Sequence, residues 1–342
     1  MTAKRADTMD LQQRLSSNPL LVIARIRETG IILVILLLVL AVSLRSPSFL
    51  TLSNFRDILL NISILIIVAL AQTMVILTKS IDLSVGSMIG LTAMMVSFII
   101  KQYPEFSPLA AILLGMAVGS VLGLFNGLII AYGEVPPIIA TLGTLSIYRG
   151  MIFLYSGGTW INAFEMSKSF KLLAKGTILG VPHLVYIAFG VAVLVYFLLN
   201  HTRLGRNIYA IGSNPDAAQF VGIPKKHIIF AVYLLSGIAC GLAGVLWASR
   251  FESAQTNTAL GFELQTVAAS VVGGVSISGG VGTVPGVLLG ALLLGIIQNA
   301  LTMIRISPFW QLAIQGLLIL LAVVVDNLIS REMQRSVRQW NR

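Results

Sequence analysis

The feature that most constrains this chain is a series of apolar stretches, each close to the length that a helix needs to cross a lipid bilayer. Such a helix needs about 20 predominantly apolar residues. Of the 342 residues, 56% are hydrophobic and 11% are charged, whereas about 25% are charged in a typical soluble domain. Too few polar side chains remain to cover a water-soluble particle of this size. The sequence therefore excludes a soluble enzyme, a secreted disulfide scaffold and a disordered chain, and it predicts a polytopic membrane protein.

The apolar stretches predict an all-α membrane bundle of about ten transmembrane helices. They lie at residues 31–44, 59–78, 84–100, 109–131, 137–155, 181–199, 228–247, 264–278, 284–304 and 309–325. Two of them are interrupted by glycine-rich turns, which favours broken or re-entrant segments. The predicted organisation is an N-terminal tail at 1–29, a transmembrane domain at 30–330 with a polar loop at 201–227, and a C-terminal tail at 331–342.

The basic residues predict which side of the membrane each segment faces, because Lys and Arg are enriched in cytoplasmic loops. With a cytoplasmic N-terminus, the predicted cytoplasmic segments hold 14 basic residues and the external segments hold 8. An even number of spans returns the C-terminus to the cytoplasm. The net charge of +10 is then largely a signal of membrane topology, and we expect lipid and no nucleic acid around the chain.

Glycine spacing predicts where helices pack together. Small residues spaced by four positions let two helix backbones approach closely in a membrane, where lipid offers no hydrophobic drive for association. The glycines at this spacing are Gly115, Gly119, Gly123 and Gly127 in one span, Gly237 and Gly241 in a second, and Gly286 and Gly290 in a third.

Two short acidic stretches indicate an inverted repeat. Residues 81–84 include Asp82 and open one predicted span, and residues 262–265 include Glu263 and open another. The predicted topology places the two stretches on opposite sides of the membrane, as two inverted blocks around a site at the midplane would require.

Polar side chains within or at the mouths of the spans are the candidates for a passage through the membrane, because such groups are costly in lipid. The candidates are Asp82, Ser84, Asn126, Thr141, Thr144, Glu263, Gln265, Gln298 and Asn299. Most are amides and hydroxyls, which favours a neutral polyhydroxylated solute over an ion. The alternative for each residue is an interhelical hydrogen bond or a helix cap, as for Asp82 just before Ser84.

No catalytic constellation emerges from the sequence. His183, His201 and His227 lack the spacing of a zinc site, so we expect no metal and no cofactor. A Gly-Lys dipeptide, which a Walker-type phosphate loop requires, is absent. We therefore expect a transport subunit and not an enzyme, with any energy source in another subunit.

The loop at 201–227 is the most informative polar stretch. Ser213 or Asn214 can cap a short helix, Pro215 suits its first turn and Gly222 can end it. A short amphipathic helix on a basic cytoplasmic loop is a plausible docking element for a soluble partner. The alternative is an ordinary connection between two spans.

Several of these segments resemble the permeases of bacterial ATP-binding-cassette (ABC) importers for monosaccharides, the ribose, arabinose, xylose and rhamnose group. The segments that carry the resemblance are 81–87, 126–127, 135–144, 205–223 and 262–282. They occur in the family's order and cover most of the chain between residues 59 and 325. Departures are small: Ser213 stands where glycine is common, and Ile138 stands where phenylalanine is usual.

The resemblance implies a permease of about ten spans in the bacterial inner membrane that works by alternating access. It also implies a second permease (the same chain or a paralogue), cytoplasmic ATP-binding subunits, and a periplasmic or lipid-anchored sugar-binding protein. The loop matches the family's ATPase-coupling loop. The matching residues are Arg203, Gly205, Arg206, Asn214, Ala217, Ala218, Gly222 and Ile223.

Within this group, the stretches 144–150, 157–163 and 306–311 look most like rhamnose-type permeases, so the expected cargo is rhamnose or a related sugar. Ribose-type and autoinducer-2-type permeases are close alternatives. Two other classes stay open on the residues alone: a passive channel or secondary carrier for small neutral solutes, and an intramembrane enzyme that uses Asp82 and Glu263.

Overall fold

The computed structural model describes residues 19–305 and, beyond them, positions 307, 310, 313, 314, 316, 317, 320 and 324, with side chains described from residue 28 onward. The helices are α2 (Pro19–Arg45), η1 (Pro47–Leu50), α3 (Leu52–Leu77), α4 (Val85–Gln102), α5 (Pro108–Ala131), α6 (Pro137–Ser156), η2 (Ala163–Glu165), α7 (Lys168–Lys175), α8 (His183–His201), α9 (Arg203–Ser213), α10 (Pro215–Phe220), α11 (Lys225–Phe251), α12 (Phe262–Val272) and α13 (Val284–Met303). A short antiparallel hairpin pairs β1 (Thr177–Ile178) with β2 (Val181–Pro182).

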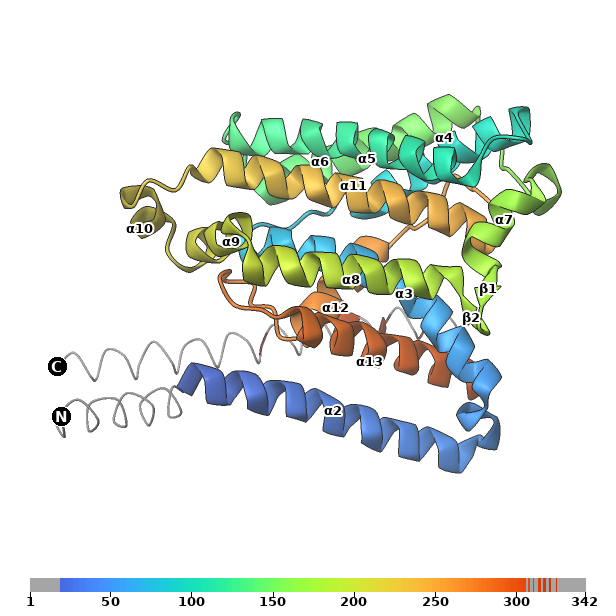
Figure 1. Cartoon of the computed structure of the whole chain (residues 1–342), viewed down its shortest axis with the longest axis horizontal. Coiled ribbons are helices and arrows are strands. Elements are labelled where there is room, and N and C mark those ends of the chain that lie inside the picture. Colours follow the sequence, from blue (N-terminus) through green and yellow to red (C-terminus); the bar gives the residue numbers. More distant parts are fainter. Residues whose placement is uncertain are drawn as a thin grey trace.

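Eight of the described helices are long and apolar enough to cross a membrane: α2, α3, α4, α5, α6, α8, α11 and α13. They run alongside one another, with α9 and α10 at one end of the bundle and α7, β1 and β2 at the opposite end (Figure 1). We call these the α10 end and the α7 end. The structure confirms the predicted all-α polytopic membrane bundle.

The predicted stretch 264–278 does not form a crossing helix but a broken segment, which its glycine-rich turn favours. Helix α12 has 11 residues, a length of about 16 Å against a hydrocarbon core of about 30 Å. It ends at Gly273, and Gly274 follows with a φ of 99°, a conformation that glycine adopts without strain. Helix α2 begins at Pro19, within the stretch expected to be a tail. The predicted span 309–325 lies mostly outside the described residues, and the C-terminal tail 331–342 lies wholly outside them.

Close packing between α5 and α11 depends on the predicted glycines. A Cβ on Gly119 would overlap the carbonyl oxygen of Gly237, and one on Gly123 would lie 2.8 Å from the Cα of Gly237. The same relation holds between α13 and α12, where a Cβ on Gly290 would lie 2.7 Å from the amide nitrogen of Gly273. The glycine stripes therefore mark helix contacts, as the spacing predicts.

Two irregular segments enter the bundle from opposite ends. Residues 78–84 return from the α10 end and lead into α4, and residues 252–261 return from the α7 end and lead into α12. The starts of the two helices meet, because a Cβ on Gly86 would lie 2.6 Å from the carbonyl oxygen of Ala259 and would overlap the carboxylate of Glu263. The two acidic stretches that the sequence pairs thus come together inside the bundle.

We expect Gly119→Ala to lower the stability of the protein by about 1–3 kcal/mol, because overpacking would force α5 away from α11. Gly190→Ala on α8 is the matched control. A Cβ there meets no atom within 4 Å, so that variant should be as stable as the parent or slightly more stable. Thermal unfolding in detergent measures both. Equal melting temperatures for the two variants would contradict this account of the interface.

Candidate functional site

A cavity of about 500 Å³ lies among α3, α11, α12 and α13, with residues 253–260 forming part of its wall. The end of α11 contributes to it, so the cavity belongs to the half of the bundle near the α7 end. Its polar lining comes from Asn61, Arg250, Ser253, Gln255, Asn257, Thr258, Gln265 and Gln298, and its aromatic lining from Trp247, Phe251 and Phe262.

The amide side chains of the cavity come from separate helices. Gln298 on α13 donates to the side-chain oxygen of Gln265 on α12 at 3.4 Å. Arg250 at the end of α11 donates to the side-chain oxygen of Asn61 and to the carbonyl oxygen of Leu60, both on α3. These contacts join α3, α11, α12 and α13 around one space.

Aromatic rings supply the apolar part of the lining. Trp247 and Phe262 meet edge to face with ring centroids 5.1 Å apart, and the Arg250 guanidinium lies 4.8 Å from the centroid of the Phe251 ring. Amides both donate and accept hydrogen bonds, while ring faces cover apolar C–H groups. This combination suits a neutral, polyhydroxylated molecule, and the volume falls in the usual range of small-molecule pockets.

The described residues contain no group of three or more His, Cys, Asp or Glu side chains that could hold a metal ion. The three described histidines lie near helix ends: His183 starts α8, His201 ends it and His227 lies in the first turn of α11.

The structure separates the predicted passage residues into four places. Gln265 and Gln298 line the cavity, whereas Glu263 lies behind its wall against Gly86. Asn299 donates to the side-chain oxygen of Asn54 at 2.8 Å and so joins α13 to α3. The other five lie around the start of α4, all buried: Asp82, Ser84, Asn126, Thr141 and Thr144.

The polar cluster at the start of α4 is internally hydrogen-bonded. Asp82 Oδ1 accepts from the amide nitrogen of Ser84 at 2.9 Å and from its hydroxyl at 2.6 Å. Asn126 on α5 donates to the Ser84 hydroxyl at 2.8 Å, and Tyr148 on α6 donates to the Asn126 side-chain oxygen at 3.2 Å. These are the interhelical contacts that the alternative interpretation of the polar residues describes.

Threonines of α6 extend this cluster. Thr141 donates to the carbonyl oxygen of Ile81 at 3.3 Å, and Thr144 donates to the carbonyl oxygen of Thr141 at 3.3 Å. In the amide orientation that satisfies both groups, Gln72 on α3 pairs with the backbone N–H and C=O of Asp82. The cluster thus supplies partners for an irregular backbone segment inside the bundle.

Sequence reasoning missed most of the cavity wall. Trp247, Gln255 and Asn257 were not among the predicted passage residues, and residues 253–260 read as an external connection. The available signal was the run of polar residues from 252 to 258 directly before the short apolar stretch of α12, because a polar loop followed by a helix too short to cross is typical of a re-entrant segment.

The predicted helix in the loop 201–227 is confirmed, and a second helix precedes it. Asn214 accepts from the amide nitrogen of Ala217 at 3.0 Å and caps α10, Pro215 is in its first turn, and Gly222 follows it with a φ of 83°. Thr202 caps α9 in the same way, accepting from the amide nitrogen of Gly205 at 3.1 Å.

The eight predicted loop residues fall into an exposed group and a group that is buried against the rest of the protein. Arg203, Arg206, Asn214, Ala217 and Gly222 are exposed, Ile223 is half-buried, and Gly205 and Ala218 are buried. On the same protruding helix, Phe220 is 91% exposed and Val221, which follows it, is 77% exposed. Helix α10 lies at the tip of the α10 end (Figure 1) and, through these side chains, presents apolar surface there.

Helix α9 is seated on the membrane helices. Tyr209 donates to the carbonyl oxygen of Gly282 at 2.8 Å, and a Cβ on Gly212 would lie 2.4 Å or less from the backbone atoms of Leu77 and Gly280. Gly280 in turn donates its N–H to the Leu77 carbonyl at 3.0 Å. The end of α3 and the turn before α13 thus contact α9 without a gap.

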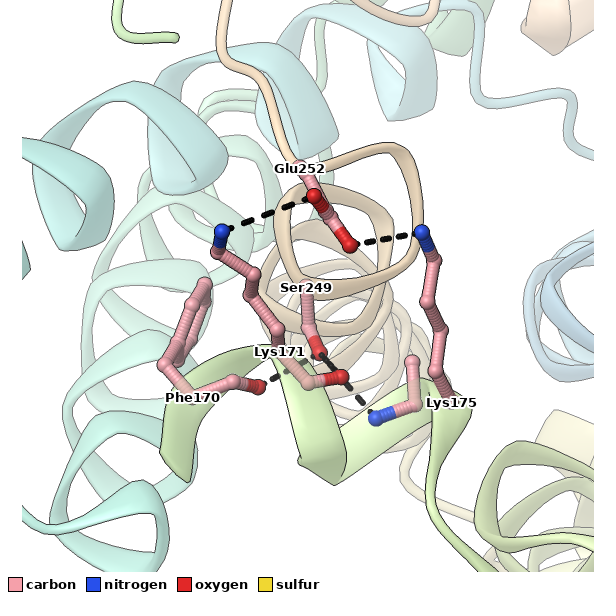
Figure 2. A network of polar contacts seen from close by, with 6 residues as sticks. Phe170, Lys171, Lys175, Ser249 and Glu252 are labelled. Carbon is pink, nitrogen blue, oxygen red and sulfur yellow. Dashed lines mark hydrogen bonds and ion pairs between the residues drawn. The ribbon is translucent and has the colours of Figure 1, made fainter. Parts of the chain in front are cut away.

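At the opposite end, α7 is tied to the end of α11 (Figure 2). Glu252 forms ion pairs with Lys175 at 2.6 Å and with Lys171 at 3.6 Å. Ser249 donates to the carbonyl oxygen of Phe170 at 2.7 Å and accepts from the amide nitrogen of residue 174 at 3.0 Å. The segment 252–261 therefore leaves α11 at a point that α7 holds in place.

Comparison with known proteins agrees with a polytopic membrane protein. Residues 54–323 match the family described as branched-chain amino acid transport system / permease component. The chain is 39% identical over 306 residues to the ribose import permease protein RbsC of Escherichia coli K12, an alignment that covers 89% of this chain and 95% of that protein. It is 41% identical over 320 residues to the galactose/methyl galactoside import permease protein MglC of the same strain, again covering 89% and 95%. It is also 38% identical over 300 residues to RbsC of Bacillus subtilis, covering 88% and 92%. No solved structure gives a significant match.

The fold and these matches define an integral membrane protein that serves as a transport component. The chain belongs to the permease family that its residues 54–323 match.

We expect the contact between Glu252 and α7 to depend on pH. The hydrogen bond from Lys175 and the nearby positive charges lower the pKa of the Glu252 carboxyl below its usual 4.5. The ion pairs therefore contribute fully above the usual pKa and are lost as the pH falls through the lowered value. Glu252→Gln should speed limited proteolysis of residues 157–182 at pH 7, and the difference from the parent should shrink as the pH falls below 4.5 and through the lowered pKa.

Lys168→Gln is the control, since Lys168 starts the same helix and has no ion pair among the described residues. A Glu252→Gln effect that persisted unchanged in acid, or an equal effect of Lys168→Gln, would contradict the assignment.

Proposed function

We propose that the chain is the transmembrane permease subunit of an ATP-driven ABC importer in a bacterial inner membrane, and that it carries a neutral monosaccharide inward by alternating access. The observation that best supports this proposal is the α9–α10 pair. Helix α10 is exposed and capped, and its neighbour α9 packs against helices that also line the polar cavity. The relatives are ribose and galactose/methyl galactoside import permeases, which supports a sugar as cargo.

The orientation follows from charge and exposure. The α10 end carries Lys79, Arg203, Arg206, Lys225 and Lys226, so we assign it, with both chain termini, to the cytoplasm. An ATP-binding subunit docks there on α10 and performs the hydrolysis, and this chain needs no cofactor. A periplasmic or lipid-anchored sugar-binding protein docks at the α7 end, near residues 159–175 and 250–261. A second permease, identical or paralogous, completes the membrane unit, and lipid surrounds it.

The proposed mechanism contains no covalent chemistry. Movement of the ATP-binding subunits displaces α9 and α10. Because α9 contacts Leu77 and the turn at Gly280, the displacement reaches α3 and, through that turn, the α12–α13 pair. These helices line the cavity, so its opening changes with the nucleotide state.

The sugar itself is a choice among close chemical relatives. Rhamnose stays the prediction from the stretches at 144–150, 157–163 and 306–311, while ribose and galactose have direct support in the names of the relatives and autoinducer-2 stays an alternative. Uptake of each radiolabelled compound, measured with the cognate sugar-binding protein, identifies the cargo.

A passive channel or secondary carrier is the second candidate, favoured only by the polar cavity. Reconstitution separates the two: proteoliposomes with the chain, its ATP-binding subunit and its binding protein should accumulate sugar only with ATP. Uptake that proceeds without ATP and stops at equal concentrations would overturn the importer proposal.

We expect Phe220→Ser to weaken association with the ATP-binding subunit about 30-fold, because a buried aromatic anchor typically contributes about 2 kcal/mol to an interface. Ala217→Arg, on the same exposed helix, should act in the same direction through steric blockage. Co-purification at graded salt and ATP-dependent uptake are the measurements.

The matched control is Phe164→Ser, because Phe164 is 86% exposed at the α7 end. It should leave ATPase association unchanged. Retention of both association and uptake by the two α10 variants would show that the coupling assignment is wrong.

We expect Gln265→Leu and Gln298→Leu each to lower ATP-dependent sugar uptake about fivefold, since each removes a neutral hydrogen-bonding group from the cavity while keeping its volume. Gln102→Leu, at the exposed end of α4, is the same substitution outside the cavity and should have no effect. Initial uptake rates, normalised to the amount of assembled complex, give the comparison. Wild-type rates for both cavity variants would exclude these residues from the passage.

A further inference from the structure

A cationic side chain within a membrane-spanning helix needs a reason, because such a residue is costly in lipid and is usually functional. Arg149 lies on α6, well inside Pro137–Ser156, and is half-buried. It is not among the residues that line the cavity. Its contacts nevertheless lead to the cavity.

The Arg149 guanidinium supplies hydrogen bonds to the irregular segment 252–261. Its Nη1 donates to the carbonyl oxygen of Thr258 at 2.8 Å and to that of Thr256 at 3.3 Å. Backbone carbonyls that leave a helix at membrane depth need such donors, because lipid provides none. Thr258 lines the cavity, so Arg149 binds the cavity wall on the side that faces away from the cavity.

Helix α4 is shaped to leave room for this contact. A Cβ on Gly90 would lie 2.9 Å from the Thr258 carbonyl oxygen and 3.2 Å from Arg149 Nη1. One turn earlier, Gly86 leaves room for Glu263, whose Oε2 is buried without a hydrogen bond in the described part of the chain. Arg149 and Glu263 thus flank one stretch of the loop with opposite charges.

We propose that Arg149 is the positioning residue that fixes the 252–261 wall of the cavity, with Glu263 as its electrostatic partner. The proposal rests on the proposed function only for its meaning in transport: a fixed wall keeps the polar lining of the cavity in place until the helices move. Arginine suits the task because its guanidinium is more weakly hydrated than a lysine ammonium and so costs less to bury.

The test is the accessibility of the wall. Thr256 is 9% exposed and Cys240 is buried, so Thr256→Cys in a Cys240→Ala background places one reporter thiol in the segment. A membrane-impermeant maleimide is then applied to the full chain in proteoliposomes. Arg149→Met should raise the labelling rate about tenfold, the usual effect of losing hydrogen bonds to a charged group, and Arg149→Lys should give an intermediate rate.

Glycine variants keep the test valid if Arg149→Met does not fold. Gly90→Ala crowds the same contact from the side of α4 and should also speed labelling, whereas Gly150→Ala, beside Arg149 but facing open space, should not. Parent-like rates for both Arg149→Lys and Gly90→Ala, or an equal rise with Gly150→Ala, would overturn the proposal.

A second readout connects the wall to transport. In complexes that import sugar, Arg149→Lys should raise the ATP hydrolysed per sugar imported without weakening ATPase association. An unchanged ratio would overturn the positioning role in transport. Labelling requires neither ATP nor sugar, so failure of the wild-type complex to import sugar would count against the proposed function alone.

Discussion

The structure depends on one constraint: a backbone group that leaves regular helix inside a bilayer must find a partner within the protein. Two irregular segments of this chain are subject to this constraint. At 78–84 the Gln72 amide pairs with both backbone groups of Asp82, and at 252–261 Arg149 donates to two carbonyls. Because these partners come from α3 and α6, the irregular segments are fixed by helices that they do not belong to. The starts of α4 and α12, and with them the cavity, are placed by these contacts.

Glycine makes this arrangement sterically possible. The α5–α11 contact brings α11 close enough to α4 for Gly244 to face Ile89 and Thr92, and α4 then presents Gly86 and Gly90 to the returning segment. Side chains at these positions would push the two inward-turning segments apart. Helix packing and the polar cluster are therefore coupled, since the polar groups meet only because the small residues let the backbones approach.

The features that could be predicted from the sequence are those that local composition determines. Eight of the ten expected spans coincide with helices of crossing length, and the cap at Asn214 and the glycine contacts were correct because each depends on residues close together in the chain. The errors concern how deep a segment lies in the membrane. Hydropathy measures whether a stretch is apolar, so it counted 264–278 among the ten spans, and only the glycine-rich turn indicated a break. It placed 253–260 outside the membrane because polar residues inside a bundle can be recognised only once their partners are known. Of the predicted passage residues, Gln265 and Gln298 line the cavity, whereas Asp82 and Asn126 belong to the hydrogen-bonded cluster at the start of α4.

Helix α3 explains how events at one end could reach the other. Its last residue, Leu77, contacts Gly212 of α9 and Gly280. About 20 to 24 Å earlier along the same helix, Ile64 and Asn61 line the cavity. Most of the intervening residues are buried and the helix has no proline, so it has little freedom to bend. A displacement of α9 therefore has two ways to be absorbed: α3 moves as a unit, or the Gly212 contact opens. Because a Cβ on Gly212 would overlap the Leu77 carbonyl oxygen, α9 has little room to slide on the end of α3, and the proposed mechanism therefore has α3 move together with α9.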